Sequence, residues 1–386
     1  MANMPLRIMT DDFQLLDEIT QYGSLQLVRS WTGIGSIELR INRYLKGADK
    51  LQRGHIIFPQ AHLNKAFQIR HKEIELDENG KATENWIIRA PALKSWFSDR
   101  LTIPPAGKSH DSIKADAESV MYHYADTQAI HTADPSDSLP VIAGVSQQRG
   151  EVVDWQSRYR DLAEEMAAIG QLSGLGWNIG IDYDAQAFRF DVLLGRDLTA
   201  GQSVNPPAIF STEFGTLQSL SYMESDLDFK NVAVVAGQGE GVDRRIVTVG
   251  DLTATGLDRR VLFVDARDVA EETEDETPVP RPVADIIRDL ENRGVQKLAE
   301  HQQEIFLEGQ ALPVSRLVYG KDYDLGDLVT LQNKEWGVTM DARITEIKEI
   351  YEPGKTGIEL MFDNSRPTLV SKIKQELAGV RNEIVR

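Results

Sequence analysis

The chain has 386 residues, of which 41% are hydrophobic and 26% charged, values typical of a soluble globular protein with about two to four domains. Its net charge of -18 argues against a nucleic-acid-binding surface, because phosphate contacts require clustered Lys and Arg. The absence of cysteine excludes a disulfide framework and a thiolate metal site.

The N-terminal sequence MANMPLRIMTDDF lacks the basic region and apolar run of a secretory signal. No apolar run approaches the ~18 residues that a membrane span requires. We therefore expect a protein that is made in the cytoplasm and does not insert into a membrane by itself.

Residues 4–97 are predicted to be mostly β-strand. Short segments rich in Ile, Leu, Val, Phe and Trp alternate with turn signals: LRIMT, SLQLVRSW, GSIELRIN, GHIIFP, AFQIRHKEIEL and NWIIRAP. One of these signals, Asn79-Gly80, predicts a hairpin turn. The spacing of the strands favours a barrel or sandwich, with Trp31, Trp86 and Trp96 packed in its core.

The region from about 98 to 200 changes character and predicts an α+β insertion. A first helix is expected at Ile113, Ala117, Val120, Met121 and Tyr124, with Ser109 or Asp111 as its cap. A second is expected at Trp155, Tyr159, Leu162, Met166 and Ile169, with Asp154 as its cap and an end at Gly174 and Gly176. The sequence WNIGIDYDAQAFRFDVLLG then predicts a hairpin, with Phe188, Phe190, Val192 and Leu194 on one face.

Residues 205–268 read as a series of strands with few groups suited to chemistry. The segment VVAGQGEGVDRR resembles a nucleotide-binding loop only superficially, because no helix follows it and no P-loop Lys-Ser/Thr is present. A hairpin tip accounts for its glycines.

After an acidic, proline-containing linker at 270–281, residues 283–309 are predicted to form a helix that is interrupted or kinked near 292–294. Residues 319–362 return to β-strand, with turns at 333–335 and 352–354. Pro367 opens a last helix with apolar residues three and four positions apart, a heptad-like seam formed by Val370, Ile373, Leu377, Val380 and Ile384. This seam predicts either a short coiled coil, leaning towards a trimer, or a helix that packs on its own domain.

No arrangement of residues predicts an active site, and we expect no catalytic, cofactor-binding or metal-ligating residues. Asp322, Asp324 and Asp327 have a spacing that could suit calcium, but the rest of an EF-hand loop is absent. The seven histidines contain neither HExxH nor any i,i+4 pair. A cluster of carboxylates, Glu73, Glu75, Asp77 and Glu78, is typical of a solvated strand edge.

Ordered short motifs give the chain a resemblance to the tail-hub, or tail-tip, proteins of long-tailed phages, which are similar to the baseplate hub protein of contractile phages. The motifs are DDF, IELRIN, GHIIF, an IRA segment, SWFSDR, LSGLGWNIGID, FDVLLGRDLT, AIFS, GTLQSLSY, DFKNVAVVAG, VLFVDARDV, Gly326-Asp327 and ARITEI. They extend from Asp11 to about Leu369, essentially the whole chain.

The resemblance implies a mainly β fold with two tube-type β-barrels. The first barrel would contain 1–97 with 205–268 and the second 315–365. Residues 98–204 would form the insertion, 269–314 an acidic linker and helix, and 366–386 the C-terminal helix.

The resemblance also implies a structural protein of the virion tail. Three copies would form a ring that closes the tail tube, adapts six-fold to three-fold symmetry and lets DNA pass. The implied partners are a distal tail protein, tail tube or tape-measure proteins, and receptor-binding or lytic tail proteins. Two alternatives stay open: a tail-tip cell-wall hydrolase, and a host carbohydrate-binding module that would use Trp86, Trp96 and Trp336 as stacking platforms.

Overall fold

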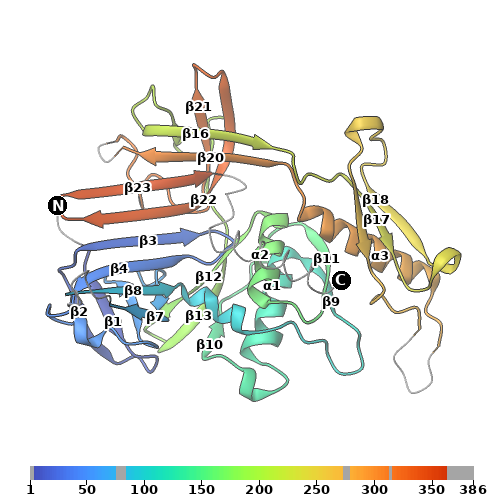
Figure 1. Cartoon of the computed structure of the whole chain (residues 1–386), viewed down its shortest axis with the longest axis horizontal. Coiled ribbons are helices and arrows are strands. Elements are labelled where there is room, and N and C mark those ends of the chain that lie inside the picture. Colours follow the sequence, from blue (N-terminus) through green and yellow to red (C-terminus); the bar gives the residue numbers. More distant parts are fainter. Residues whose placement is uncertain (1–3, 75–83, 273–278, 313–314, 363–386) are drawn as a thin grey trace, which may run out of the picture.

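The computed structural model describes residues 4–74, 84–272, 279–312 and 315–362. It is mainly β, as the sequence predicts (Figure 1). Within these residues no helix is long and apolar enough to cross a membrane. Asn79-Gly80 with Glu75, Asp77 and Glu78, and the five seam residues from Val370 to Ile384, lie outside the described residues.

The chain contains two β units, which we call the first barrel and the second barrel; in the first, two sheets enclose one core. One sheet has the order β2-β1-β5-β6 and comprises β1 (Leu6–Met9), β2 (Leu15–Ile19), β5 (Ile56–Pro59) and β6 (Phe67–Gln68). The other sheet contributes β3 (Ser24–Ser30), β4 (Ser36–Asn42), β7 (His71–Glu73) and β8 (Asn85–Pro91). Alternate apolar residues of both sheets, such as Ile8, Leu27 and Ile88, are fully buried between them.

The second barrel combines strands that lie far apart in the sequence. Its members are β14 (Asp197–Leu198), β15 (Ile209–Phe210), β16 (Leu217–Ser225), β20 (Glu304–Ala311), β21 (Leu328–Asn333), β22 (Val338–Glu352) and β23 (Lys355–Phe362). Phe210, Leu331, Ile344 and Phe362 belong to its core and have no exposed surface or almost none.

The long strand β22 joins the two barrels. Residues 338–343 pair with β21, whereas residues 346–351 pair antiparallel with β3 of the first barrel. One hydrogen-bonded path therefore runs through both barrels in the order β16-β20-β23-β22-β3-β4-β8-β7, with the second barrel above the first in Figure 1. Because the backbone ladder is continuous, the barrels share a wall rather than a flexible linker.

The insertion between the barrels has the predicted α+β character. It contains the short 3-10 helix η2 (Leu93–Asp99), β9 (Asp111–Asp116), α1 (Ala117–Ala125), β10 (Val141–Ala143), β11 (Val152–Ser157), α2 (Leu162–Ser173), β12 (Gly176–Asp182) and β13 (Ala187–Leu193). The β12–β13 hairpin is confirmed, with Phe188, Phe190 and Val192 buried, although Leu194 beyond it is exposed.

Both helices of the insertion begin later than predicted. The carboxylate of Asp116 accepts the N–H of Ser119 at the start of α1, and that of Asp161 accepts the N–H of Glu164 at the start of α2. The residues proposed as caps, Asp111 and Asp154, instead lie in the paired strands β9 and β11. The predicted end of α2 at Gly174 is confirmed, with a φ of 74°.

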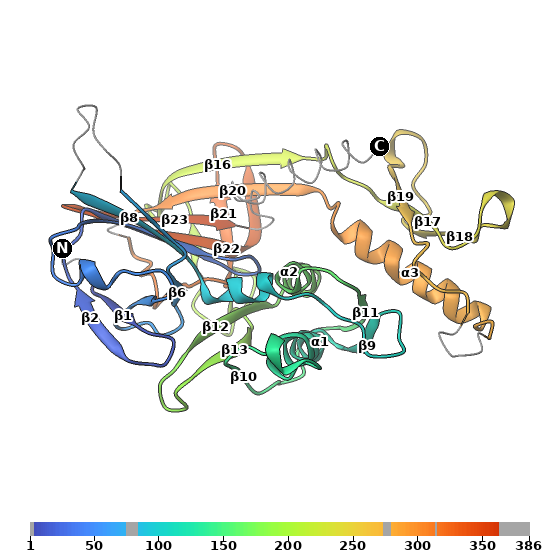
Figure 2. The ribbon, with the colours of Figure 1, turned by 60° about the horizontal axis from the view of Figure 1, so that its bottom comes forward.

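A separate α3 unit is formed by β17 (Val232–Ala236), β18 (Ile246–Gly250), β19 (Val261–Asp265) and α3 (Val283–Ala299). Its sheet has the order β18-β17-β19, and Figure 2 shows α3 lying along it. The segment that resembles a nucleotide-binding loop connects β17 to β18, which pair antiparallel. Gly239 and Gly241 supply positive φ angles in this connection, so the predicted hairpin tip is confirmed.

Two predictions about this part of the chain are wrong. Residues 205–268 do not share a barrel with residues 1–97: β15 and β16 join the second barrel, and β17 to β19 form the α3 unit. The helix predicted over 283–309 ends at Ala299, and residues 304–311 form β20 between β16 and β23. These pairings join strands from distant parts of the sequence. Local propensity predicts that a strand forms but not which strand it pairs with.

Candidate functional site: the junction of the two barrels and the insertion

The two barrels and the insertion meet at Trp31, which directly follows β3 and is 3% exposed. Its backbone N–H donates to the carbonyl oxygen of Thr345 on β22, at 2.8 Å. Its indole Nε1 donates to the carbonyl oxygen of Gly174 in the insertion, at 3.1 Å. A single residue of the first barrel is therefore hydrogen-bonded to both neighbouring bodies.

Glycines from three sequence motifs leave the space that this junction requires. A Cβ atom at Gly176 would lie 2.4 Å from the Trp31 ring, and one at Gly326 would lie 2.1 Å from it. A Cβ atom at Gly195 would lie 1.7 Å from the carbonyl oxygen of Gly326. Gly326 also has a φ of +89°, which residues with a side chain rarely adopt. These motifs thus have a packing function at the junction.

Arg343 of β22, in the second barrel, contacts the residues of the junction. Its guanidinium lies 5.7 Å from the centre of the Trp31 ring, a cation–π distance. Its Nη1 donates to the carbonyl oxygen of Gly326 at 2.5 Å. The side chain therefore links the ring of Trp31 to the loop that carries Gly326.

A buried charged network lies beside Trp31. Glu349 of β22 is fully buried, and its Oε1 accepts Nζ of Lys65 at 2.7 Å and the hydroxyl of Tyr319 at 2.7 Å. Its other oxygen accepts the hydroxyl of Tyr351 at 2.8 Å. Arg29 of β3 donates to Asp324 of the second barrel. Both ion pairs thus connect the first barrel to the second.

The charges of this network depend on one another. Burial would raise the pKa of Glu349, but the ammonium of Lys65 and the guanidinium of Arg29 outweigh it and hold that pKa below its ordinary value. Burial lowers the pKa of Lys65, and the charge of Glu349 partly offsets this effect. Removing either partner would leave the other as an unpaired buried charge.

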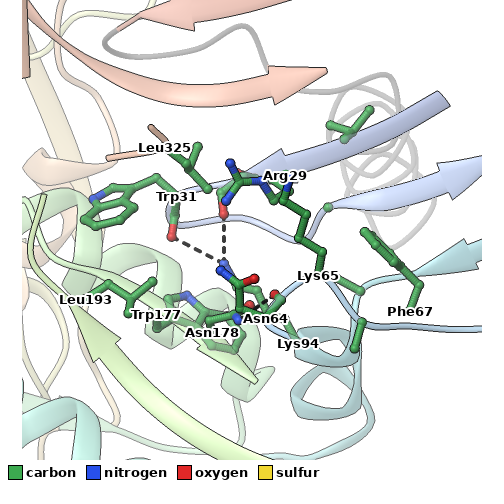
Figure 3. Close-up of a pocket in the computed structure, with 15 residues that line it drawn as sticks. Arg29, Trp31, Asn64, Lys65, Phe67, Lys94, Trp177, Asn178, Leu193 and Leu325 are labelled. Carbon is green, nitrogen blue, oxygen red and sulfur yellow. Dashed lines mark hydrogen bonds between the residues drawn. The ribbon is translucent and has the colours of Figure 1, made fainter. Parts of the chain in front are cut away.

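A cavity of about 40 Å³ opens at the same junction (Figure 3). Its walls come from β3, from the loop before β6, from η2, from β12 and from the loop after Tyr323. Arg29, Lys65 and Lys94 all contribute to its lining. The volume suits one or a few water-sized molecules and not an extended substrate.

The three aspartates considered for calcium have protein partners instead. Asp327 is 3% exposed and receives a bidentate contact from Arg196, with Nη2 to Oδ2 at 2.6 Å. Asp324 pairs with Arg29, and Asp322 accepts the backbone N–H of Val318 at 2.8 Å. Within the described residues no group of three His, Asp or Glu side chains is placed to hold a metal ion.

The tryptophans considered as sugar platforms do not form a common surface. Trp96 is 6% exposed and donates to the side chain of Gln68. Trp86 is half-buried beneath the ammonium of Lys72, which lies 4.4 Å from its ring centre. Trp336, at 48% exposure near the β21–β22 turn, offers an open ring.

Sequence reasoning missed the residues of the junction. Trp31 was predicted only as a core residue. Arg29, Lys65, Lys94 and Glu349 carried no recognisable signal, because charged residues are mostly exposed. The sequence did contain one signal. LSGLGW has two glycines, Gly174 and Gly176, and the end of α2 requires only the first.

Solved structures with the same fold include two prophage tail proteins and a further bacterial tail protein. The 43 kDa tail protein of prophage MuSo2 from Shewanella oneidensis has a TM-score of 0.53 and 11% identity, covering 93% of this chain and 98% of its own. Prophage tail protein gp18 from Listeria monocytogenes has a TM-score of 0.52 and 13% identity, covering 98% and 99%. A tail protein from Neisseria meningitidis has a TM-score of 0.53 and 10% identity, covering 94% and 98%.

No curated protein matches the chain by sequence. A family model does match, over residues 5–362, which include both barrels, the insertion and the α3 unit. The predicted resemblance to phage tail proteins is therefore confirmed, and the chain belongs to the Siphovirus ReqiPepy6 Gp37-like protein family.

Proposed function

We propose that the protein is a structural hub of a phage or prophage tail tip, in which three copies form a ring that closes the tail tube. The observation that carries the proposal is the shared wall of the two barrels, one continuous strand path through β22 and β3. Two barrels held in one fixed relation by each chain would give six barrels per ring from three copies. Such a ring can contact a six-fold tube on one side and three-fold tip proteins on the other.

The junction around Trp31 supports this role. A ring that adapts one symmetry to another needs both barrels of each copy at a constant angle. The buried Trp31 ring and the Lys65–Glu349 pair, with Nζ and Oε1 2.7 Å apart, oppose any change of that angle. We propose that the partners on the two sides are a distal tail protein and the tail tube or tape-measure proteins.

The ring would also provide a passage for DNA. The net charge of -18 favours transit, because carboxylates repel the phosphate backbone and a basic wall would retain it. Reversing acidic residues on the lumen surface should slow genome delivery while assembly proceeds. Unchanged delivery rates in such variants would contradict this part of the proposal.

We propose a structural and not an enzymatic role. The purified protein should leave host cell walls intact, and release of soluble peptidoglycan fragments would favour a hydrolase instead. The exposed ring of Trp336 is the specific observation that favours carbohydrate binding. If that alternative held, host polysaccharide would change the tryptophan fluorescence of the protein, and Trp336→Ala would abolish the change.

The C-terminal seam gives the ring proposal a second test. In a trimeric stem, Leu377→Asp would place three carboxylates in the apolar seam and should lower the trimer fraction seen by light scattering. Lys374→Asp, which lies between seam positions, should leave that fraction nearly unchanged. If the two variants had the same trimer fraction, the seam would not belong to the interface between the copies.

A further inference from the structure

Lys94 is an unusual residue of the junction cavity. It lies in η2, is 2% exposed and contributes to the cavity wall. Its Nζ donates to the backbone carbonyls of Ser30 at 3.1 Å and Trp31 at 3.3 Å, and it lies 4.3 Å from the centre of the Trp177 ring (Figure 3). These partners are dipoles and a ring face, so none of them neutralises an ammonium charge.

The carboxylates of the junction are already committed to other cations. Asp324 pairs with Arg29, and Glu349 pairs with Lys65. As far as the structure describes the cavity wall, it contains three basic side chains and no acidic one. Within the described part of the chain, Lys94 has no carboxylate at ion-pair distance, and burial lowers its pKa well below the ordinary value. With Lys94 protonated, the cluster would therefore carry one positive charge more than its carboxylates balance.

A donor atom in the same cluster is also unsatisfied. Nε of Arg29 is buried and has no hydrogen-bond partner among the described residues, and the nearest carboxylate oxygen in an ion-pair contact, Oε1 of Glu349, is 3.9 Å away. A buried N–H without an acceptor is destabilising, because it has lost its hydrogen bond to water. Because Arg29 and Lys94 both line the cavity, a negatively charged acceptor there would offer a partner to each of them.

We propose that the junction cavity binds one small monovalent anion, of the size of chloride or formate. The volume of about 40 Å³ admits an ion comparable to a water molecule and excludes a large organic anion. Bound there, the anion holds Lys94 in its charged form and ties η2 of the insertion to β3 of the first barrel. The position of the two barrels relative to the insertion then depends on the anion.

The first test compares salts at constant ionic strength. Replacing sodium gluconate by sodium chloride should raise the Tm of the full chain by about 2 °C, because the ion binds the folded form only. Formate should act like chloride. Identical Tm values in chloride, formate and gluconate would overturn the proposal.

A pair of variants separates this site from general salt effects. Lys94→Met keeps the length of the side chain but removes its charge, and it should abolish the difference between chloride and gluconate. Lys72→Met is the matched control, since Lys72 also lies over a tryptophan ring, 4.4 Å from the centre of Trp86, but outside the cavity. A chloride effect that persists in Lys94→Met, or disappears in Lys72→Met, would contradict the assignment.

Crystals of the unaltered protein grown in sodium bromide give a test that needs no variant. The anomalous signal of bromide should appear in the cavity, within hydrogen-bonding reach of Lys94 Nζ or Arg29 Nε. Bromide peaks on the surface alone, with none in the cavity, would overturn the proposal even if Lys94→Met failed to fold.

Discussion

The insertion borders two neighbours, and the two borders differ in kind. Towards the barrels it presents buried aromatic and glycine surfaces, with Trp177 Nε1 donating to the carbonyl oxygen of Thr32 at 2.8 Å. Towards the α3 unit it presents polar contacts, in which Asp268 lies 3.0 Å from His110 Nε2 and 2.9 Å from Arg293 Nη2. The Asp268 side chain is 37% exposed, whereas Trp31 is 3% exposed.

From this difference we expect one fixed body and one part that can move. The α3 unit is joined to the second barrel by two chain segments that lie side by side, with the N–H of Lys230 donating to the carbonyl oxygen of His301 at 3.0 Å. Adjacent connections of this kind act as one hinge. We expect the barrels and the insertion to stay rigid and the α3 unit to move against them.

The largest effect is expected from Trp31→Ala. Removing this ring leaves a cavity between three bodies and should lower the free energy of unfolding by about 3–5 kcal/mol. The matched control is Trp336→Ala, whose ring is 48% exposed and whose loss should change stability by less than about 1 kcal/mol. Urea denaturation followed by circular dichroism measures both. If both variants lost a similar free energy of unfolding, the junction would contribute no more to stability than an exposed side chain does.

A somewhat smaller effect is expected from Glu349→Gln. The substitution keeps the shape but leaves the buried ammonium of Lys65 without its carboxylate, which should destabilise the protein by about 3 kcal/mol. Glu359→Gln, which removes a half-exposed partner of Lys348 on the neighbouring strand, should have an effect below about 1 kcal/mol. The same denaturation experiment compares them, and a Glu349→Gln variant as stable as Glu359→Gln would show that the buried pair is dispensable.

The packing between Gly176 and Trp31 can be isolated by a double-mutant cycle. Gly176→Ala alone should destabilise the protein by about 1–3 kcal/mol, since its Cβ would lie 2.4 Å from the ring. In a Trp31→Ala background the same substitution should have almost no effect, because the obstacle is gone. If the losses in the free energy of unfolding were additive, Gly176 would not act through the ring of Trp31.

The last prediction concerns the contact of Asp268 between the insertion and the α3 unit. Its loss should have the smallest effect on global stability and the largest effect on motion. The hydrogen bond from His110 and the charge of Arg293 hold the pKa of Asp268 well below its usual range against the opposing effect of burial. The contact therefore contributes fully above the ordinary Asp pKa of about 4 and is lost as the pH falls from there towards the folded value.

Spin labels can follow this motion, because the chain has no cysteine of its own. Labels at Val145→Cys in the insertion and Val242→Cys in the α3 unit occupy sites that are 86% and 99% exposed. Asp268→Asn should broaden the distance distribution between them at neutral pH, and acidification from about pH 4 downwards should broaden it progressively in the parent protein. A narrow distribution in both cases would make the α3 unit part of the fixed body.

The sequence predicted those parts of the fold that local patterns determine. Alternating apolar residues identified the strands of residues 4–97 and the β12–β13 hairpin, and Gly174 marked the end of α2. The grouping of 205–268 failed because β16 pairs with β20, which lies in a distant part of the chain, by a register that only tertiary packing selects. The helix predicted across 292–294 is not interrupted there. Its Gly294 instead allows α3 to pack closely against Val249 and Val235.

The site was harder to predict than the fold. Glu349 lies in ITEIKEIYE, where its charge suggests a solvent-facing position, yet it shares the buried face of β22 with Ile347. Its partners Lys65 and Arg29 come from other segments, so no spacing along the chain relates them. The glycine motifs could be recognised as a pattern, but their physical reason, the ring of Trp31, is apparent only in three dimensions.

The central claim is that a rigid pair of barrels in each chain builds a three-copy ring at the tail tip. Cryo-electron microscopy of intact tails tests it most directly, by counting copies of the protein and placing both barrels of each. The account predicts three copies around the tail axis, with six barrels at similar radius and the wall between β22 and β3 intact. Six copies, or a location away from the end of the tube, would contradict it.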